Sequence, residues 1–202
     1  MSAAATLFPR IIAAAAENGS FTDRMQMLIA HCEQQIPHND WSKLRRVDYE
    51  ADTKALEGWL GEALAKAPPG EALQGLWFGL CNPLVDDETT ADIYIAASTE
   101  YSSGSIDWAV EASFFPENGF LNSRVLSEVY RLAYSDPNGL GNEAEYPLAL
   151  AYGAMAARAA LESSVSLLPR ELLGAAAGFD SGDFLFLGTF QHRRFKANVT
   201  AG

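Results

Sequence analysis

Lysine and arginine are absent from one long stretch of this 202-residue chain, between Lys66 and Arg124. The same stretch holds nine carboxylates: Glu71, Asp86, Asp87, Glu88, Asp92, Glu100, Asp107, Glu111 and Glu117. Because no fixed cation accompanies them, we expect this segment to project a negative field toward solvent or toward a basic partner. The net charge of the whole chain is −12. Nucleic acids and anionic lipids are bound by clustered Lys and Arg, so direct nucleic-acid binding is disfavoured.

Cysteine and histidine are also scarce. Cys32 and Cys81 are far apart in the sequence, and the three histidines do not have the spacing of metal ligands. We therefore expect no disulfide framework, no metal and no cofactor. Phosphate-binding loops, nucleophile elbows and His-Glu-x-x-His motifs are missing from the sequence, which leaves acid–base chemistry few candidate residues. The expectation is a protein that is not an enzyme.

The sequence lacks the run of about 20 apolar residues that spans a bilayer. Arg10 is followed by Ile11, Ile12 and four alanines, but this run is shorter than the apolar core of a secretory signal. We expect a cytoplasmic location and no membrane contact.

Helical periodicity dominates the first third of the chain. Ser20 is a candidate N-cap for an apolar stripe that ends at Pro37, and residues 52–67 repeat the pattern until Pro68-Pro69-Gly70. These features predict a helical N-terminal segment, residues 1–68, packed on a main domain of residues 69–202 within one cooperative unit.

Extended patterns follow the break. Residues 73–80 and 91–97 predict a hairpin whose loop, residues 82–90, carries Asp86, Asp87 and Glu88. Residues 98–122 predict an ordered, aromatic-rich loop region in which residues 106–111 are a candidate short strand.

Helices and a second hairpin make up the rest. Ser123 is a candidate cap for a helix to about residue 134, residues 146–161 predict a central core helix, and two strands flank a turn at residues 180–183. This order predicts an α+β fold with helices packed on a largely antiparallel sheet of about four to five strands. The basic cluster near the C-terminus, formed by His192, Arg193, Arg194 and Lys196, predicts a solvated tail or an internal counter-charge for the acidic segment.

The acidic segment supplies the candidate site for a protein partner. It comprises Asp86, Asp87, Glu88, Asp92, Glu100, Tyr101, Asp107, Trp108 and Glu111. Exposed aromatic groups surrounded by carboxylates are typical of interaction hot spots for a basic protein. Trp108 is open to two interpretations at this point, a core residue or an exposed contact.

Two alternatives remain open. Glu143, Glu145, Asp180 and Asp183 would serve a carboxylate-dependent hydrolase if they met in one pocket, although helix capping and turn formation explain the same residues. A nucleic-acid mimic that blocks DNA-binding proteins would also need many carboxylates along one face.

Three short segments, residues 75–83, 141–147 and 178–184, are similar to motifs of a group of uncharacterised bacterial cytoplasmic proteins. This group includes immunity proteins, the antitoxin partners of secreted polymorphic toxins. The resemblance implies an inhibitor or binding role and assigns no catalytic residue. The leading hypothesis is therefore an acidic immunity protein that inhibits a basic toxin by direct contact.

Overall fold

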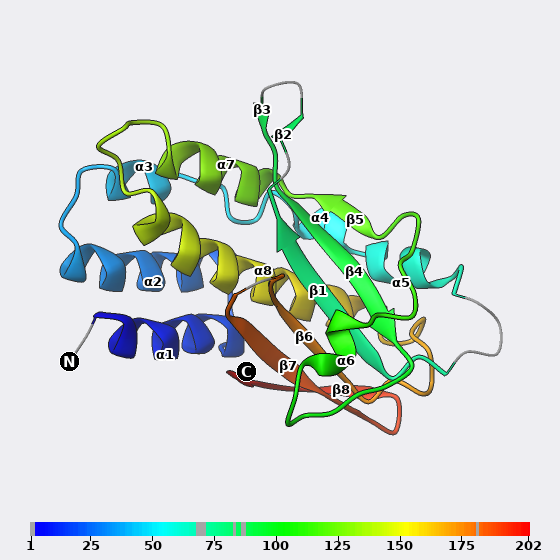
Figure 1. Cartoon of the computed structure of the whole chain (residues 1–202). Helices are drawn as coiled ribbons and strands as arrows, with labels where there is room; N and C mark the ends of the chain where they lie inside the picture. The colour runs from blue at the N-terminus through cyan, green and yellow to red at the C-terminus, as the bar shows by residue number, and fades with distance from the viewer. Residues whose placement is uncertain (1–2, 68–71, 83, 86–87, 181) are drawn as a thin grey trace.

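The computed structural model describes residues 3–67, 72–82, 84–85, 88–180 and 182–202. Helices occupy the N-terminal third and the centre of the chain (Figure 1). The helices are α1 (Ala3–Ala16), α2 (Phe21–Gln35), α3 (Trp41–Leu44), α4 (Thr53–Leu56), α5 (Trp59–Leu64), α6 (Asp107–Val110), α7 (Arg124–Ala133) and α8 (Asn142–Ser164).

A six-stranded sheet has the order β5-β4-β1-β6-β7-β8. Its strands are β1 (Gly75–Cys81), β4 (Asp92–Ser98), β5 (Phe120–Asn122), β6 (Gly174–Phe179), β7 (Phe184–Gln191) and β8 (Arg194–Ala201). A separate two-stranded ribbon pairs β2 (Leu84–Val85) with β3 (Glu88–Thr89). All neighbours in the large sheet are antiparallel except β1 and β6, which are parallel. The predicted α+β class and both predicted hairpins are confirmed, with more strands than expected.

Helix α8 lies against one face of this sheet, and α1, α2 and α7 pack around it (Figure 1). The helix is buried on nearly every side because small residues line it. Gly153 shows how close the approach is, since a Cβ atom there would lie 2.4 Å from Leu80 Cδ2 on β1. Residues 146–161 therefore form the predicted core helix, which is longer than expected.

The N-terminal helices share one hydrophobic core with the sheet. The buried side chain of Arg158 on α8 donates hydrogen bonds to the carbonyl oxygens of Ala16 at 2.5 Å and Glu17 at 3.2 Å. These carbonyls end α1, where a helix leaves acceptors unpaired and carries partial negative charge. A cation on the central helix thus fixes the first helix in place.

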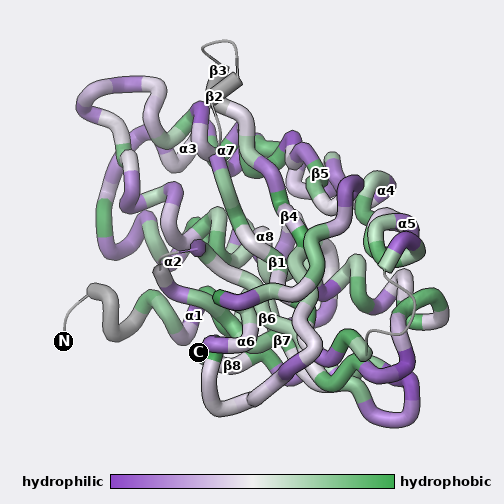
Figure 2. Tube along the Cα trace, turned by 45° about the vertical axis from the view of Figure 1, so that its right-hand side comes forward, coloured by the Kyte–Doolittle hydropathy of each residue, from purple (hydrophilic) through white to green (hydrophobic). Residues whose placement is uncertain are grey.

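The opposite face of the sheet is covered only in part. Helix α6 and the chain around it lie over β1 and β4, where Trp77, Trp108 and Ala176 form a second, smaller apolar cluster. Figure 2 shows hydrophobic residues along β1, β6 and α8, whereas hydrophilic residues lie on the outer helices as well as in loops. This half-covered face holds the candidate site.

Two sequence expectations are wrong. Residues 107–110 form a helix, α6, instead of a strand. The residues of the basic cluster are exposed, as expected, but they belong to the β7–β8 hairpin and not to a tail: Arg194 and Lys196 lie in β8, and His192 and Arg193 form its turn with φ values of 50° and 62°. Within the described residues, no helix is long and apolar enough to cross a membrane.

Candidate functional site

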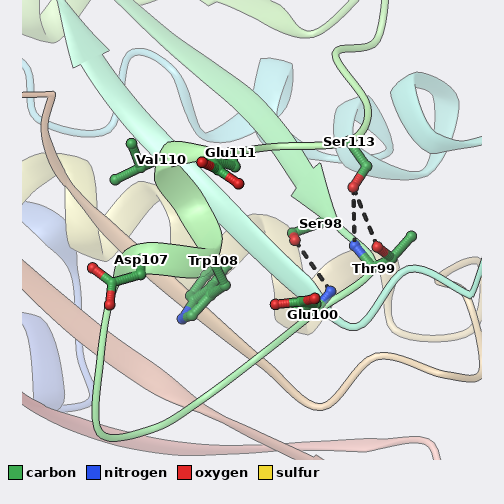
Figure 3. Close-up of a pocket in the computed structure, with 8 residues that line it drawn as sticks. All are labelled: Ser98, Thr99, Glu100, Asp107, Trp108, Val110, Glu111 and Ser113. Atoms are coloured by element: carbon green, nitrogen blue, oxygen red, sulfur yellow. Dashed lines mark hydrogen bonds between the residues drawn. The ribbon is translucent and has the colours of Figure 1, made fainter.

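An acidic pocket of about 540 Å³ lies between α6 and the end of β4 (Figure 3). Three carboxylates line it, Glu100 from the segment after β4 and Asp107 and Glu111 from α6 and its C-cap. The remaining lining residues are Ser98, Thr99, Trp108, Val110 and Ser113. The pocket therefore combines the end of one strand with a single helical turn.

Local structure fixes the carboxylates. Asp107 N–H donates to Ser105 Oγ at 3.1 Å where α6 begins. Residues four apart lie on the same side of a helix, so Asp107 and Glu111 both reach the pocket. In Figure 3 the indole of Trp108 lies between Asp107 and Glu100.

Gly75 on β1 makes this packing possible. A Cβ atom on Gly75 would lie 2.5 Å from Trp108 Cε3 and 2.9 Å from the carbonyl oxygen of Glu100. Trp108 also donates its indole N–H to the carbonyl oxygen of Ser102 at 3.1 Å. The floor of the pocket, the part formed by Trp108, is therefore a tryptophan ring packed directly against Gly75.

The three pocket carboxylates have no cation near them. No lysine or arginine lines the pocket, and none of the ion pairs among the described residues includes Glu100, Asp107 or Glu111. Glu117, from the same acidic segment, differs because it lies 3.5 Å from Lys66 Nζ. The negative charge of the pocket is thus left to solvent or to a bound partner.

An aromatic groove of about 330 Å³ lies on the other side of α6. Its walls include Trp77, Tyr94 and Phe184 from the sheet and Phe115 from the loop, with Asp180 at its edge. Trp77 Nε1 donates to Tyr94 Oη at 3.2 Å, and Tyr94 Oη donates in turn to Asp180 Oδ1. Burial and then the bond to Asp180 raise the pKa of Tyr94 well above its usual range.

Glycine again sets the position of an aromatic ring. A Cβ atom on Gly79 would lie 2.0 Å from Tyr94 Cε1, so the ring of Tyr94 covers that glycine. Val110 lines both the groove and the acidic pocket. One short helix therefore separates a polar, acidic hollow from an apolar one.

The predicted aromatic contacts lie inward. Trp108 is only 5% exposed, so of its two interpretations the structure supports the core residue, although its indole also lines the acidic pocket. Tyr101 is half-buried, with its ring 5.3 Å from that of Trp108, and burial raises the pKa of its hydroxyl. Trp108 thus lines the acidic pocket, and Tyr101 packs against Trp108.

The structure does not gather all the predicted carboxylates. Asp92 lies at the opposite end of β4 from the acidic pocket, where it accepts a hydrogen bond from Asn122 Nδ2 at 2.9 Å. Glu88 lies in β3, at the same distant end (Figure 1). Asp86 and Asp87 lie outside the described residues. Among the predicted carboxylates whose side chains the structure describes, only Glu100, Asp107 and Glu111 are brought together.

The four carboxylates of the hydrolase alternative are each engaged elsewhere. Glu145 accepts a hydrogen bond from Tyr134 Oη at 2.9 Å, and Asp183 accepts one from Tyr146 Oη at 2.5 Å. Glu143 lines a separate hollow with Cys32, while Asp180 lines the aromatic groove. In the part of the chain that the structure describes, no group of three or more His, Cys, Asp or Glu side chains is arranged to hold a metal ion.

Sequence reasoning missed the aromatic groove. Its residues come from 77–115 and 179–184, two regions that are far apart in the sequence and are brought together by the pairing of β1 with β6. One signal of a shared site was present in the sequence. Residues 171–192 contain no lysine or arginine, and neither does the acidic segment. Comparison with protein-family models, curated proteins and solved structures finds no match to this chain.

Proposed function

We propose that this chain is a non-enzymatic binding protein that holds a basic protein partner at the acidic pocket. The observation that carries the proposal is the convergence of Glu100, Asp107 and Glu111 on one pocket without a described cation beside them. An unpaired cluster of this kind attracts Lys or Arg side chains, accelerates encounter and makes binding sensitive to salt.

An immunity protein that blocks a basic toxin is the specific form of this function that we favour. Cytoplasmic residence would suit such an inhibitor, because it protects the cell that makes the toxin. The net charge of −12 supports this form, as does the resemblance of residues 75–83, 141–147 and 178–184 to a group of bacterial proteins that includes immunity proteins. Charge complementarity would set the rate of association, and buried contacts would set the lifetime of the complex.

The test removes the three pocket charges and compares the result with an equal loss of charge elsewhere. The pocket variant carries Glu100→Gln, Asp107→Asn and Glu111→Gln. The control carries Glu57→Gln, Glu62→Gln and Glu171→Gln, three exposed carboxylates with no hydrogen bond or ion pair in the described structure.

Both variants and the wild type would be immobilised, and proteins retained from the native host identified by mass spectrometry. The expected result is a basic protein held by wild type and control but lost from the pocket variant. With the purified partner, the pocket variant should associate about tenfold more slowly at low salt, and the difference should shrink as salt rises. Equal retention and equal association rates in all three proteins would contradict the proposal, and retention of a DNA-binding protein would favour nucleic-acid mimicry instead.

A further inference from the structure

The aromatic groove has an unusual balance of hydrogen-bonding groups. Its two side-chain donors, Trp77 Nε1 and Tyr94 Oη, are already used, the first on Tyr94 and the second on Asp180. Asp180 Oδ2 has no hydrogen-bond partner among the described residues. The described side chains of the groove therefore offer a ligand an acceptor and no free donor, which favours a cation over an anion.

The walls of the groove match a cation with apolar groups. Trp77 and Phe184 meet edge to face with their ring centroids 6.2 Å apart, and the ring of Tyr94 lies beside them. The faces of aromatic rings carry negative electrostatic potential and attract substituted ammonium and guanidinium groups. Among the described residues that line the groove, Asp180 is the only charged one.

The surroundings strengthen this preference. Asp107 and Glu111 line the acidic pocket on the other side of α6, and no lysine or arginine lines either hollow. A volume of about 330 Å³ suits a small organic group. Val110 and Phe115, at the mouth of the groove, are 78% and 62% exposed, so apolar contact area is available to a ligand that enters.

We propose that the aromatic groove binds an organic cation, a substituted ammonium or guanidinium group. Its charge lies against Asp180 Oδ2, and its apolar atoms contact Trp77, Tyr94 and Phe184. The cation is supplied either by a small molecule or by a Lys or Arg side chain of a protein. Only the second source rests on the proposed function, because the partner would then fill the groove and the acidic pocket together.

Two charged probes and their neutral isosteres test the proposal on the unmodified protein. Choline is compared with 3,3-dimethylbutanol, and N-acetyl-arginine amide with N-acetyl-citrulline amide. The indole N–H signal of Trp77 in proton–nitrogen NMR spectra, assigned by its loss in Trp77→Phe, reports occupancy. At least one cation is expected to bind saturably and about tenfold more tightly than its isostere.

Two neighbouring carboxylates provide a matched pair of variants. Asp180→Asn should weaken binding of that cation at least about fivefold, because it removes the charge at the groove. Asp183→Asn removes a charge from the same turn, but Asp183 bonds Tyr146 outside the groove, so affinity should stay within about twofold.

The stronger of the two cations identifies the source, small molecule or side chain. Equal affinity for a cation and its neutral isostere would overturn the proposal, as would the absence of saturable binding of both cations up to about 50 mM. Both of these outcomes are measured on the wild-type protein, so they test the proposal even if Asp180→Asn disturbs folding. They are also separate from the test of the proposed function, which changes only the acidic pocket.

Discussion

Asp52 and Ser123 are joined by a hydrogen bond of 2.6 Å from Ser123 Oγ to Asp52 Oδ2. Asp52 is 2% exposed, and the backbone N–H of Arg124 also donates to it at 3.1 Å. Tyr152 Oη on α8 donates to the same carboxylate at 3.1 Å. One buried carboxylate therefore fastens the start of α7 and the middle of α8 to the N-terminal segment, and the positive end of α7 stabilises its charge.

Asp52→Asn should destabilise the protein by about 3 kcal/mol. The amide NH2 group would face the hydrogen-bond donors that the carboxylate now accepts from, and the hydrogen bonds to a charged group would be lost. Urea unfolding followed by circular dichroism measures the change in free energy. Asp48→Asn is the control, since Asp48 is exposed and, among the described residues, its carboxylate accepts a hydrogen bond only from the N–H of Glu50. A loss in Asp52→Asn no larger than in the control would contradict this role for Asp52.

Alkaline pH should weaken the fold through buried tyrosines. Burial raises the pKa of Tyr49, Tyr130 and Tyr152 above the usual range. The folded state thus favours the neutral phenol, whereas the tyrosines of the unfolded chain ionise from pH about 10. The stabilisation of the fold by these tyrosines is therefore complete below pH about 10 and is lost as the pH rises above it. Each such tyrosine should remove about 1.4 kcal/mol of stability per pH unit above that point.

Urea midpoints at pH 8, 10 and 11 measure this loss, together with the phenolate absorbance. In Tyr49→Phe the loss of stability per pH unit should be smaller by the contribution of one tyrosine. At pH 8 the variant should be about 1 kcal/mol less stable, because it lacks the hydrogen bond from Tyr49 Oη to the carbonyl oxygen of Leu44. A slope identical to that of wild type would show that Tyr49 ionises equally in both states.

Gly75→Ala should disrupt the floor of the acidic pocket. The added methyl group would overlap Trp108, whose ring atom Cε3 lies 2.5 Å from the new Cβ position. We expect a loss of about 2 kcal/mol and a shift in tryptophan fluorescence, because an overpacked ring must move. Gly104→Ala is a suitable control, since a Cβ atom on Gly104 would lie 3.8 Å from Ser102 Oγ, an ordinary contact distance. Equal stability of the two variants would mean that Trp108 does not pack on Gly75.

The turn between β7 and β8 should tolerate a better sequence. His192 and Arg193 both have positive φ, a conformation that favours Asn and Gly in two-residue hairpins. The double change His192→Asn and Arg193→Gly should stabilise the protein by about 1 kcal/mol. Arg193→Ala removes the same charge but keeps a Cβ atom, so thermal unfolding should show no gain. Stabilisation by both variants would assign the effect to charge rather than to backbone strain.

Local patterns predicted the elements that carry strong periodicity or capping residues. Ser20 and Ser123 cap α2 and α7 as expected, because each accepts a backbone N–H three residues later. Strand β8 was missed because only Val199 is buried in it, which leaves little alternation to detect at a sheet edge. The four-residue helix α6 is too short to produce a helical period.

The candidate site was only partly predictable for a related reason. Asp107 and Glu111 are about one turn apart because α6 is a helix, whereas in a strand they would share a face but lie about 13 Å apart along it. Asp180 and Phe184 reach Trp77 through the parallel pairing of β1 with β6, which no local pattern encodes. The charge imbalance was visible in the sequence, whereas its division between the two ends of β4 was not.

The parallel pairing of β1 with β6 also has a consequence for synthesis of the chain on the ribosome. Strand β1 ends at Cys81, and its partner on that side begins only at Gly174. Until β6 has been translated, the hairpin of β1 and β4 has an open edge on the β1 side, and before α8 has been translated its apolar face is uncovered as well. Such nascent surfaces aggregate readily. The β1 edge of this hairpin is therefore a surface that a chaperone could shield during translation.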